Sequence, residues 1–62
     1  MHNIGHIKYT MFDSGGRLCI GNIQGEADII RRMDANDIAD YNNKQNPFSQ
    51  FLEVTEVTYY SE

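Results

Sequence analysis

Residues 6–20 read HIKYTMFDSGGRLCI, and this stretch decides the fold of the chain. Apolar and polar side chains alternate along its first seven positions, which is typical of a half-buried strand whose inner face carries Ile7, Tyr9 and Met11. The turn that follows, Asp13–Gly16, contains two glycines, and glycine supplies the positive φ that a tight hairpin requires. Residues 17–20 then return as a second strand, with Leu18 and Ile20 on one side. The stretch predicts a β-hairpin.

Residues 21–33 have no single pattern. Gly25 fits either a second turn or a β-bulge. In 27–33 the spacing of Ala27, Ile30 and Met33 fits a helix, whereas the adjacent Ile29 and Ile30 fit a short strand equally well. Because a helix start is predicted directly after this segment, extended backbone is favoured for 27–33, and a helix remains the alternative.

A helix is predicted from about Ala35 to Lys44. Asp34 can cap its first amides and Asp37 can reach back to the cap, while Met33 and Ile38 have the spacing of a hydrophobic staple. The inner face would carry Ile38 and Tyr41, and the pair Asn46-Pro47 ends the helix.

The segment 51–60 is rich in β-branched and aromatic residues and predicts a final strand. Its alternation slips by one position, and a β-bulge near Thr55–Glu56 would restore one apolar face of Leu52, Val54, Val57 and Tyr59. The predicted fold is α+β: a small antiparallel sheet of three to four strands with one α-helix packed on it, in the order β-β-(β)-α-β. We expect one acidic domain spanning residues 1–62.

The length of 62 residues limits what can stabilise this fold. A chain of this size buries only about 60% of its unfolded surface, so small domains often add disulfides, a metal or a second copy. Cys19 is the only cysteine, and His2, His6 and Cys19 lack the spacing of a zinc site. We therefore expect no disulfide, no metal or other cofactor, and a homodimer.

No signal peptide and no apolar run of the roughly 20 residues needed to cross a bilayer is visible in the sequence. The expectation is a complete, soluble, cytoplasmic domain with no membrane partner.

The net charge of −4 is concentrated in the second half of the chain. Residues 1–33 carry four cations and three acids, or +1, whereas residues 34–62 carry one lysine and six acids, or −5. An acidic surface disfavours direct binding to nucleic acid and favours a protein partner with a basic surface.

Catalysis is not expected, because no nucleophile elbow, phosphate-binding loop or metal-assisted spacing surrounds His2, His6, Cys19 or the carboxylates. Arg31 and Arg32 are interpreted as solvated or paired with internal carboxylates. A partner-binding surface is instead predicted from acids and aromatics on the helix and the last strand: Asp37, Ile38, Asp40, Tyr41, Phe51, Glu53, Glu56 and Tyr60. The alternative is that the acids only solubilise the domain. Phe12, Phe51 and Tyr60 are expected on the second face of the sheet or at an edge.

The order hairpin, helix, strand in a short acidic chain resembles the small dimeric phage inhibitors of uracil-DNA glycosylase. The residues that carry the resemblance are Tyr9–Met11 leading into the Asp13–Gly16 turn, Asp37-Ile38 with Tyr41, and the strand Phe51–Tyr60. The resemblance implies an acidic helix beside an aromatic residue that imitates DNA and captures an exposed apolar side chain of the enzyme. This chain departs from that pattern by an extra stretch around residues 22–33, and only Asp37 and Asp40 can stand for the helical glutamate of the family.

Two functions therefore remain open. The first is an acidic inhibitor, of phage type, that occupies the DNA-binding surface of a DNA-processing enzyme in the cytoplasm of the host cell. The second is a structural or regulatory interaction subunit that acts through an exposed sheet edge or face. Direct nucleic-acid binding through Lys8, Arg17, Arg31 and Arg32 is a weaker third reading.

Overall fold

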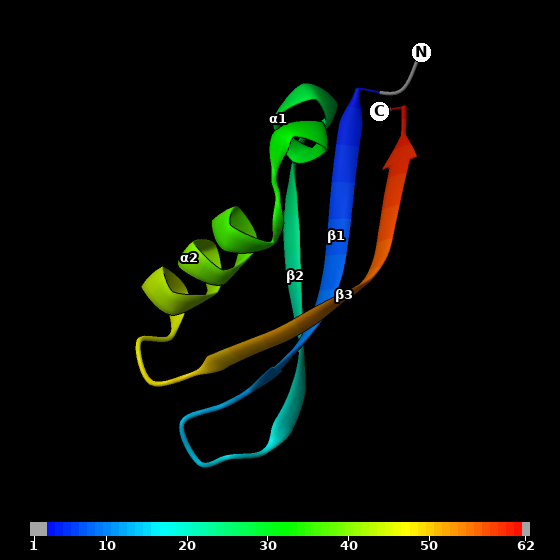
Figure 1. Cartoon of the computed structure of the whole chain (residues 1–62). Helices are drawn as coiled ribbons and strands as arrows, with labels where there is room; N and C mark the ends of the chain where they lie inside the picture. The colour runs from blue at the N-terminus through cyan, green and yellow to red at the C-terminus, as the bar shows by residue number, and fades with distance from the viewer. Residues whose placement is uncertain (1–2, 62) are drawn as a thin grey trace.

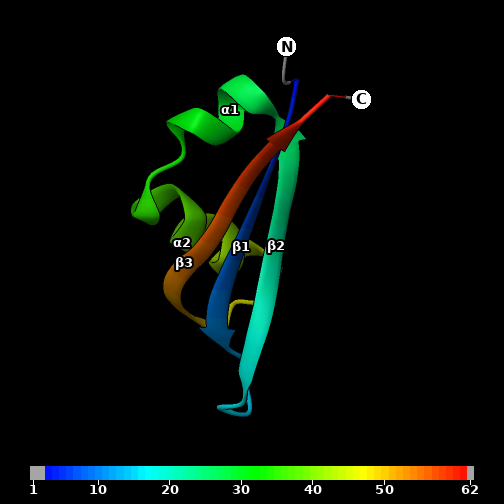
Figure 2. The same cartoon turned by 90° about the vertical axis from the view of Figure 1, so that its right-hand side faces the viewer.

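In the part of the chain that the structure describes, three antiparallel strands form a sheet that carries two helices on one face and no helix on the other (Figures 1 and 2). The computed structural model describes residues 3–61. Its elements are β1 (Ile4–Phe12), β2 (Leu18–Glu26), α1 (Ala27–Arg32), α2 (Ala35–Gln45) and β3 (Gln50–Tyr60), and the strand order is β2-β1-β3. The predicted α+β class is confirmed, with two short helices where one was expected.

The β1–β2 hairpin is confirmed, and Asp13 organises its turn. One carboxylate oxygen of Asp13 accepts the N–H groups of Gly15 and Arg17, both at 2.9 Å, and Gly16 adopts a positive φ of 78°. The N–H of Arg17, together with that of Gly15 and the Cys19 thiol, holds the pKa of Asp13 below its usual value. The carboxylate therefore supports the turn in its ionised form.

β2 is longer than predicted and regular to its end, so Gly25 is neither a turn nor a bulge. Gly25 pairs with Gly5, and the register between β1 and β2 is unbroken from Phe12↔Leu18 to Ile4↔Glu26. Ile30 of α1 packs directly over Gly5, the residue that pairs with Gly25. A Cβ built on Gly5 would lie 2.6 to 2.9 Å from three Ile30 atoms. The glycine lets the helix approach the sheet closely.

The expectation of an extended segment at 27–33 is wrong, because Ala27–Arg32 forms α1. Ala27 and Ile30 are three residues apart and both are buried, whereas Asp28 and Ile29 are exposed, which is the burial pattern of a helix. On the solvent side Arg31 pairs with Asp28 at 3.2 Å and lies 4.7 Å from the centre of the Tyr59 ring. Burial of Ile30 against the sheet therefore outweighs the local preference of the β-branched Ile29 and Ile30 for extended backbone.

The helix predicted at 35–44 is confirmed as α2, together with its N-terminal cap. The Asp34 carboxylate accepts the N–H of Asp37 at 2.9 Å, and the Asp37 carboxylate accepts the N–H of Asp34 at 3.1 Å. This reciprocal capping box satisfies two of the amides that a helix start leaves without partners. Met33 and Ile38 both pack in the core cluster, as a hydrophobic staple requires.

β3 contains the predicted bulge and a second irregularity. Lys8 pairs with Glu56 and Tyr9 with Val54, so Thr55 is the extra residue, and its hydroxyl donates to the Lys8 carbonyl at 3.2 Å. A second shift skips Leu52. As a result Phe51, not Leu52, joins the apolar face, and its ring lies 5.7 Å from that of Tyr9. Phe51 therefore lies on the helix face of β3, which is an edge strand, so the edge position expected for it holds and the second-face position is wrong.

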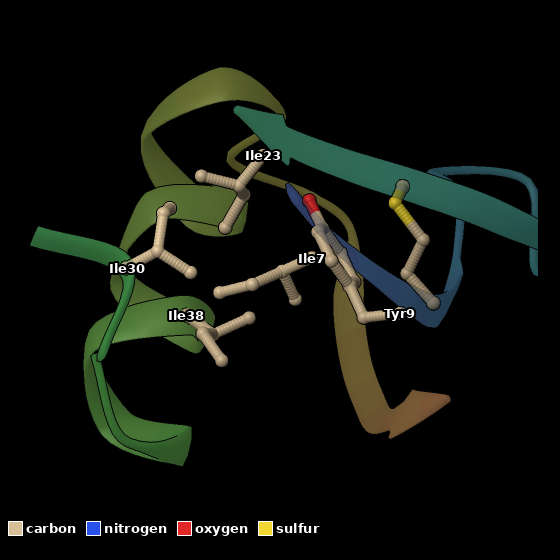
Figure 3. Packing of buried hydrophobic residues seen from close by; sticks show 6 residues of the cluster. Ile7, Tyr9, Ile23, Ile30 and Ile38 are labelled. Carbon is tan, nitrogen blue, oxygen red and sulfur yellow. The ribbon is translucent and has the colours of Figure 1, made fainter. Parts of the chain in front are cut away.

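The core lies between the sheet and the two helices. Figure 3 shows Ile30 and Ile38 pointing from the helices toward Ile7 on β1, with Ile23 from β2 beside them. The buried members of this core are Ile7, Tyr9, Met11, Ile23, Ile30 and Ile38. The inner face predicted for the first strand is thereby confirmed in full.

A buried polar chain ties α2 to the sheet. The Tyr9 hydroxyl donates to Oδ1 of Asn42 at 3.1 Å, and Nδ2 of Asn42 donates to the Ser49 hydroxyl at 2.9 Å. The Ser49 hydroxyl donates in turn to the Asn46 carbonyl at 2.6 Å. Within residues 3–61 no buried side-chain nitrogen or oxygen lacks a partner, and both polar atoms of the Asn42 side chain, which is only 1% exposed, are hydrogen-bonded within the chain.

Burial, with a smaller contribution from Tyr41, raises the pKa of the Tyr9 hydroxyl above its usual value. The folded state thus holds this proton more tightly than the unfolded state does. Its stabilising contribution is complete below the ordinary tyrosine pKa of about 10 and is lost as the pH rises beyond it. We expect the wild type to lose free energy of unfolding more steeply than Tyr9→Phe as the pH rises above about 10, measured by urea titration. Equal losses in the two proteins would contradict this prediction.

Candidate partner-binding surface

The eight residues predicted to bind a partner fall into three groups in the structure. Ile38 is 3% exposed and belongs to the core, so it cannot contact a partner without unfolding. Tyr41 and Phe51 are half-buried and pack against the same core. The five that remain exposed are Asp37, Asp40, Glu53, Glu56 and Tyr60.

The two aspartates of α2 have different surroundings. Asp37 is engaged in the capping box, so a structural role already accounts for it. Asp40 lies in the middle of the helix, away from the N-terminal turn where the helix dipole favours acids. It is therefore the carboxylate on α2 that the helix itself does not require.

Glu53 and Glu56 lie on the face of the sheet that carries no helix. Glu56 pairs with Lys8, and their charged groups are 3.9 Å apart. Glu53 pairs with Thr10, whose neighbours Tyr9 and Met11 point into the core. Paired residues of a sheet share a face, so both glutamates point away from α2. The four carboxylates of the predicted surface are consequently divided between the two sides of the sheet, with Asp37 and Asp40 on α2 and the two glutamates on the opposite face.

Exposed valines on β3 were not among the predicted binding residues. Val54 and Val57 pair with Tyr9 and Ile7 and so share the helix side of the sheet, yet they remain 37% and 45% exposed. The two short helices do not extend over this part of the edge strand. β3 therefore presents valines on one face and carboxylates on the other. The sequence predicted an apolar face on this strand, and that was the available signal for these valines. It did not show that the helices would leave the face partly uncovered.

A second apolar patch lies on the bare face at the hairpin end. Leu18 and Ile20 are 67% and 69% exposed, and Phe12 pairs directly with Leu18. Tyr60, 41% exposed, lies on the same face at the opposite end of the sheet, paired with Ile4. The second-face positions expected for Phe12 and Tyr60 agree with this register.

Among side chains with possible catalytic chemistry, His6 and Cys19 each have a hydrogen-bond partner on the hairpin. His6 bonds to the Asn22 amide oxygen at 3.0 Å, and the Cys19 thiol donates to Asp13 at 3.7 Å. No group of three or more histidine, cysteine or carboxylate side chains in the described part of the chain could hold a metal ion. His2, the other candidate base, lies outside the described residues.

Neither α1 nor α2 has the length or the apolar composition that a membrane crossing requires. Comparison with known protein families, curated proteins and solved structures finds no match. The resemblance to the glycosylase inhibitors therefore stays a prediction.

Proposed function

We propose that the chain is a non-catalytic, acidic binding protein that inhibits a DNA-processing enzyme by occupying its basic DNA-binding surface. The observation that carries the proposal is the composition of β3, which exposes Glu53 and Glu56 on one face and Val54 and Val57 on the other. Uracil-DNA glycosylase is the first enzyme to test. We place the action in the cytoplasm, that of the host cell if the chain is phage-encoded.

Charge and exposed apolar side chains support β3 as the contact. Glu53 and Glu56 would meet cationic side chains that otherwise bind phosphate, and such complementarity raises both specificity and association rate. Val54 and Val57 would supply apolar contact, which an interface core needs for affinity. Asp40 on α2 adds a further carboxylate that has no role in capping.

The test is inhibition of uracil-DNA glycosylase, and of a panel of other DNA-processing enzymes, by the purified chain. The double variant Glu53→Gln/Glu56→Gln should weaken inhibition about tenfold, which corresponds to about 1.4 kcal/mol. Rising salt should weaken inhibition by the wild type more than inhibition by the double variant, because the double variant has fewer charges for the salt to screen.

A matched control separates this effect from a general loss of charge. Glu56→Gln and Asp28→Asn each remove one exposed acid, and each breaks one surface ion pair. Only the first lies on β3, so only the first should weaken inhibition. Equal weakening of inhibition by Glu56→Gln and Asp28→Asn would count against the proposal. So would binding that stays unchanged when Glu53, Glu56 and Asp40 are replaced together.

A second candidate function is an interaction subunit that acts through its bare sheet face. The exposed patch of Phe12, Leu18 and Ile20 favours it, because isolated apolar residues are ordinary on a surface but a cross-strand cluster is a typical contact site. In that case Leu18→Ser should abolish association with the partner while the carboxylate variants leave it intact. Phe51 does not serve as a probe, since it packs against Tyr9 and its loss would disturb the fold.

A further inference from the structure

The sheet has two free edges, and they differ in how well they are protected against pairing. β3 carries two register shifts and the charges of Glu53 and Glu56, and natural sheets use such irregularities and charges to prevent edge-to-edge contact. β2 is regular over all nine residues and has no charge between Leu18 and Gly25. Figure 2 shows β2 as the outermost strand of the sheet, with no helix beyond it and only the red C-terminal end of the chain reaching past it at the top. The molecule measures 40 × 16 × 15 Å, so a strand edge is a large part of its surface.

The hydrogen bonds at the two ends of the hairpin show which main-chain groups of β2 face outward. The N–H of Asp13 donates to Arg17 at 2.9 Å, and at the far end the N–H of Ala27 donates to Asn3 at 3.1 Å. Hydrogen-bonded and non-bonded pairs alternate in an antiparallel ladder, so the odd-numbered residues of β2 bond to β1. The residues left with outward N–H and C=O groups are Leu18, Ile20, Asn22, Gln24 and Glu26.

We propose that the β2 edge binds the β2 edge of a second copy of this chain, antiparallel about a twofold axis at Asn22, giving one six-stranded sheet. This register overlaps the whole of β2 and pairs every outward main-chain group. Ile20 lies opposite Gln24 of the other copy, and Leu18 lies opposite its Glu26. The proposal concerns a different edge from the β3 contact and does not depend on that function.

Charge complementarity identifies the second copy as the occupant. The β2 edge begins beside the cation Arg17 and ends at the anion Glu26, so antiparallel pairing brings each end beside its opposite, twice by symmetry. The acidic second half of the chain, with α2 and β3, stays away from the contact. The small core, with Cys19 as its only cysteine, gains from the additional partner.

The variant that tests this contact adds a charge at the β2 edge. Ile20 is 69% exposed and points away from the core, so Ile20→Lys should leave the fold intact and disfavour pairing. Thr58→Lys is the matched control: it adds the same charge on the same face, but on β3. A strand edge is narrow compared with a stable interface of about 800 Å² per partner, so we expect a dimer that dissociates on dilution.

Sedimentation equilibrium over a range of concentrations should give a dimer for the wild type and Thr58→Lys, and at least tenfold weaker association for Ile20→Lys. Circular dichroism checks that each variant is folded. A wild type that stays monomeric at millimolar concentration would overturn the proposal, as would equal weakening by the two lysine variants.

Crosslinking tests the register. In a Cys19→Ser background, Asn22→Cys places two thiols opposite each other across the axis, where a hydrogen-bonded pair has Cα atoms about 5.5 Å apart, within disulfide range. Mild oxidation should give a covalent dimer for Asn22→Cys and not for Thr58→Cys in the same background. The reverse pattern would assign the contact to β3 and contradict the proposal.

Discussion

Replacing Gly21 with alanine should lower the free energy of unfolding by about 3 kcal/mol, the upper end of the usual range for overpacking a core. The ring of Tyr9 lies across Gly21, and an added Cβ would fall 2.2 to 2.6 Å from three of its atoms, including the hydroxyl oxygen. That ring is buried, packs against Phe51 and is held by the hydrogen bond to Asn42. It cannot move aside without breaking this bond or shifting α2.

Gly25→Ala is the control for this prediction. Gly25 is on the same strand and the same face, but the nearest atom to its added Cβ is in Ile30 at 4.0 Å, an ordinary contact. Because alanine also restricts the unfolded chain more than glycine, Gly25→Ala should be neutral or slightly stabilising. Urea titration measures both variants. If Gly21→Ala lowered the free energy of unfolding by less than about 1 kcal/mol, the Tyr9 ring would be able to move aside more easily than its contacts indicate, which would contradict the prediction.

Replacing Asn42 with leucine should cost about 2 to 3 kcal/mol, although the two side chains are similar in size. The substitution leaves the buried Tyr9 hydroxyl without an acceptor and removes the donor that binds Ser49. An unpaired buried polar group costs its full desolvation penalty, which is larger than the net value of the bond it lost. Thermal or urea unfolding provides the measurement.

Two comparisons make the Asn42 prediction specific. Asn43→Leu changes the exposed neighbour on the same helix and should alter stability by no more than about 0.5 kcal/mol. Adding Tyr9→Phe to Asn42→Leu should restore part of the loss, because the unpaired hydroxyl is then absent. If the effects of the two substitutions were simply additive, the hydrogen bond between Tyr9 and Asn42 would not contribute as proposed.

Local patterns were sufficient wherever one residue type has one strong preference. The alternation of Ile7, Tyr9 and Met11 predicted the inner face of β1, and the Asp34 cap predicted the start of α2 within one residue. The slip in the last strand predicted the bulge at Thr55, because a period of two cannot absorb an extra residue otherwise. These features depend on neighbours in the chain and need no knowledge of the rest of the molecule.

Prediction failed where a distant residue decides the outcome. Adjacent Ile29 and Ile30 suit a strand, and only the close approach of Ile30 to Gly5 makes a helix the better solution. The candidate site shows the same limit. Its residue types were identified from the sequence, but the sheet register placed Glu53 and Glu56 opposite the helices and the core took Ile38. Exposure of Val54 and Val57 depends on how far two short helices extend.

The sequence by itself determined the hairpin, the capped helix, the bulged last strand and the separation of charge between the two halves, since each follows from short-range preferences or from counting. The tertiary structure decided which surfaces remain available. Two short helices can cover only one face of a three-stranded sheet, so the other face and both edges stay open. Register shifts and carboxylates then distinguish the β3 edge from the regular β2 edge, which has no charge between Leu18 and Gly25, and no local pattern of residues shows that difference.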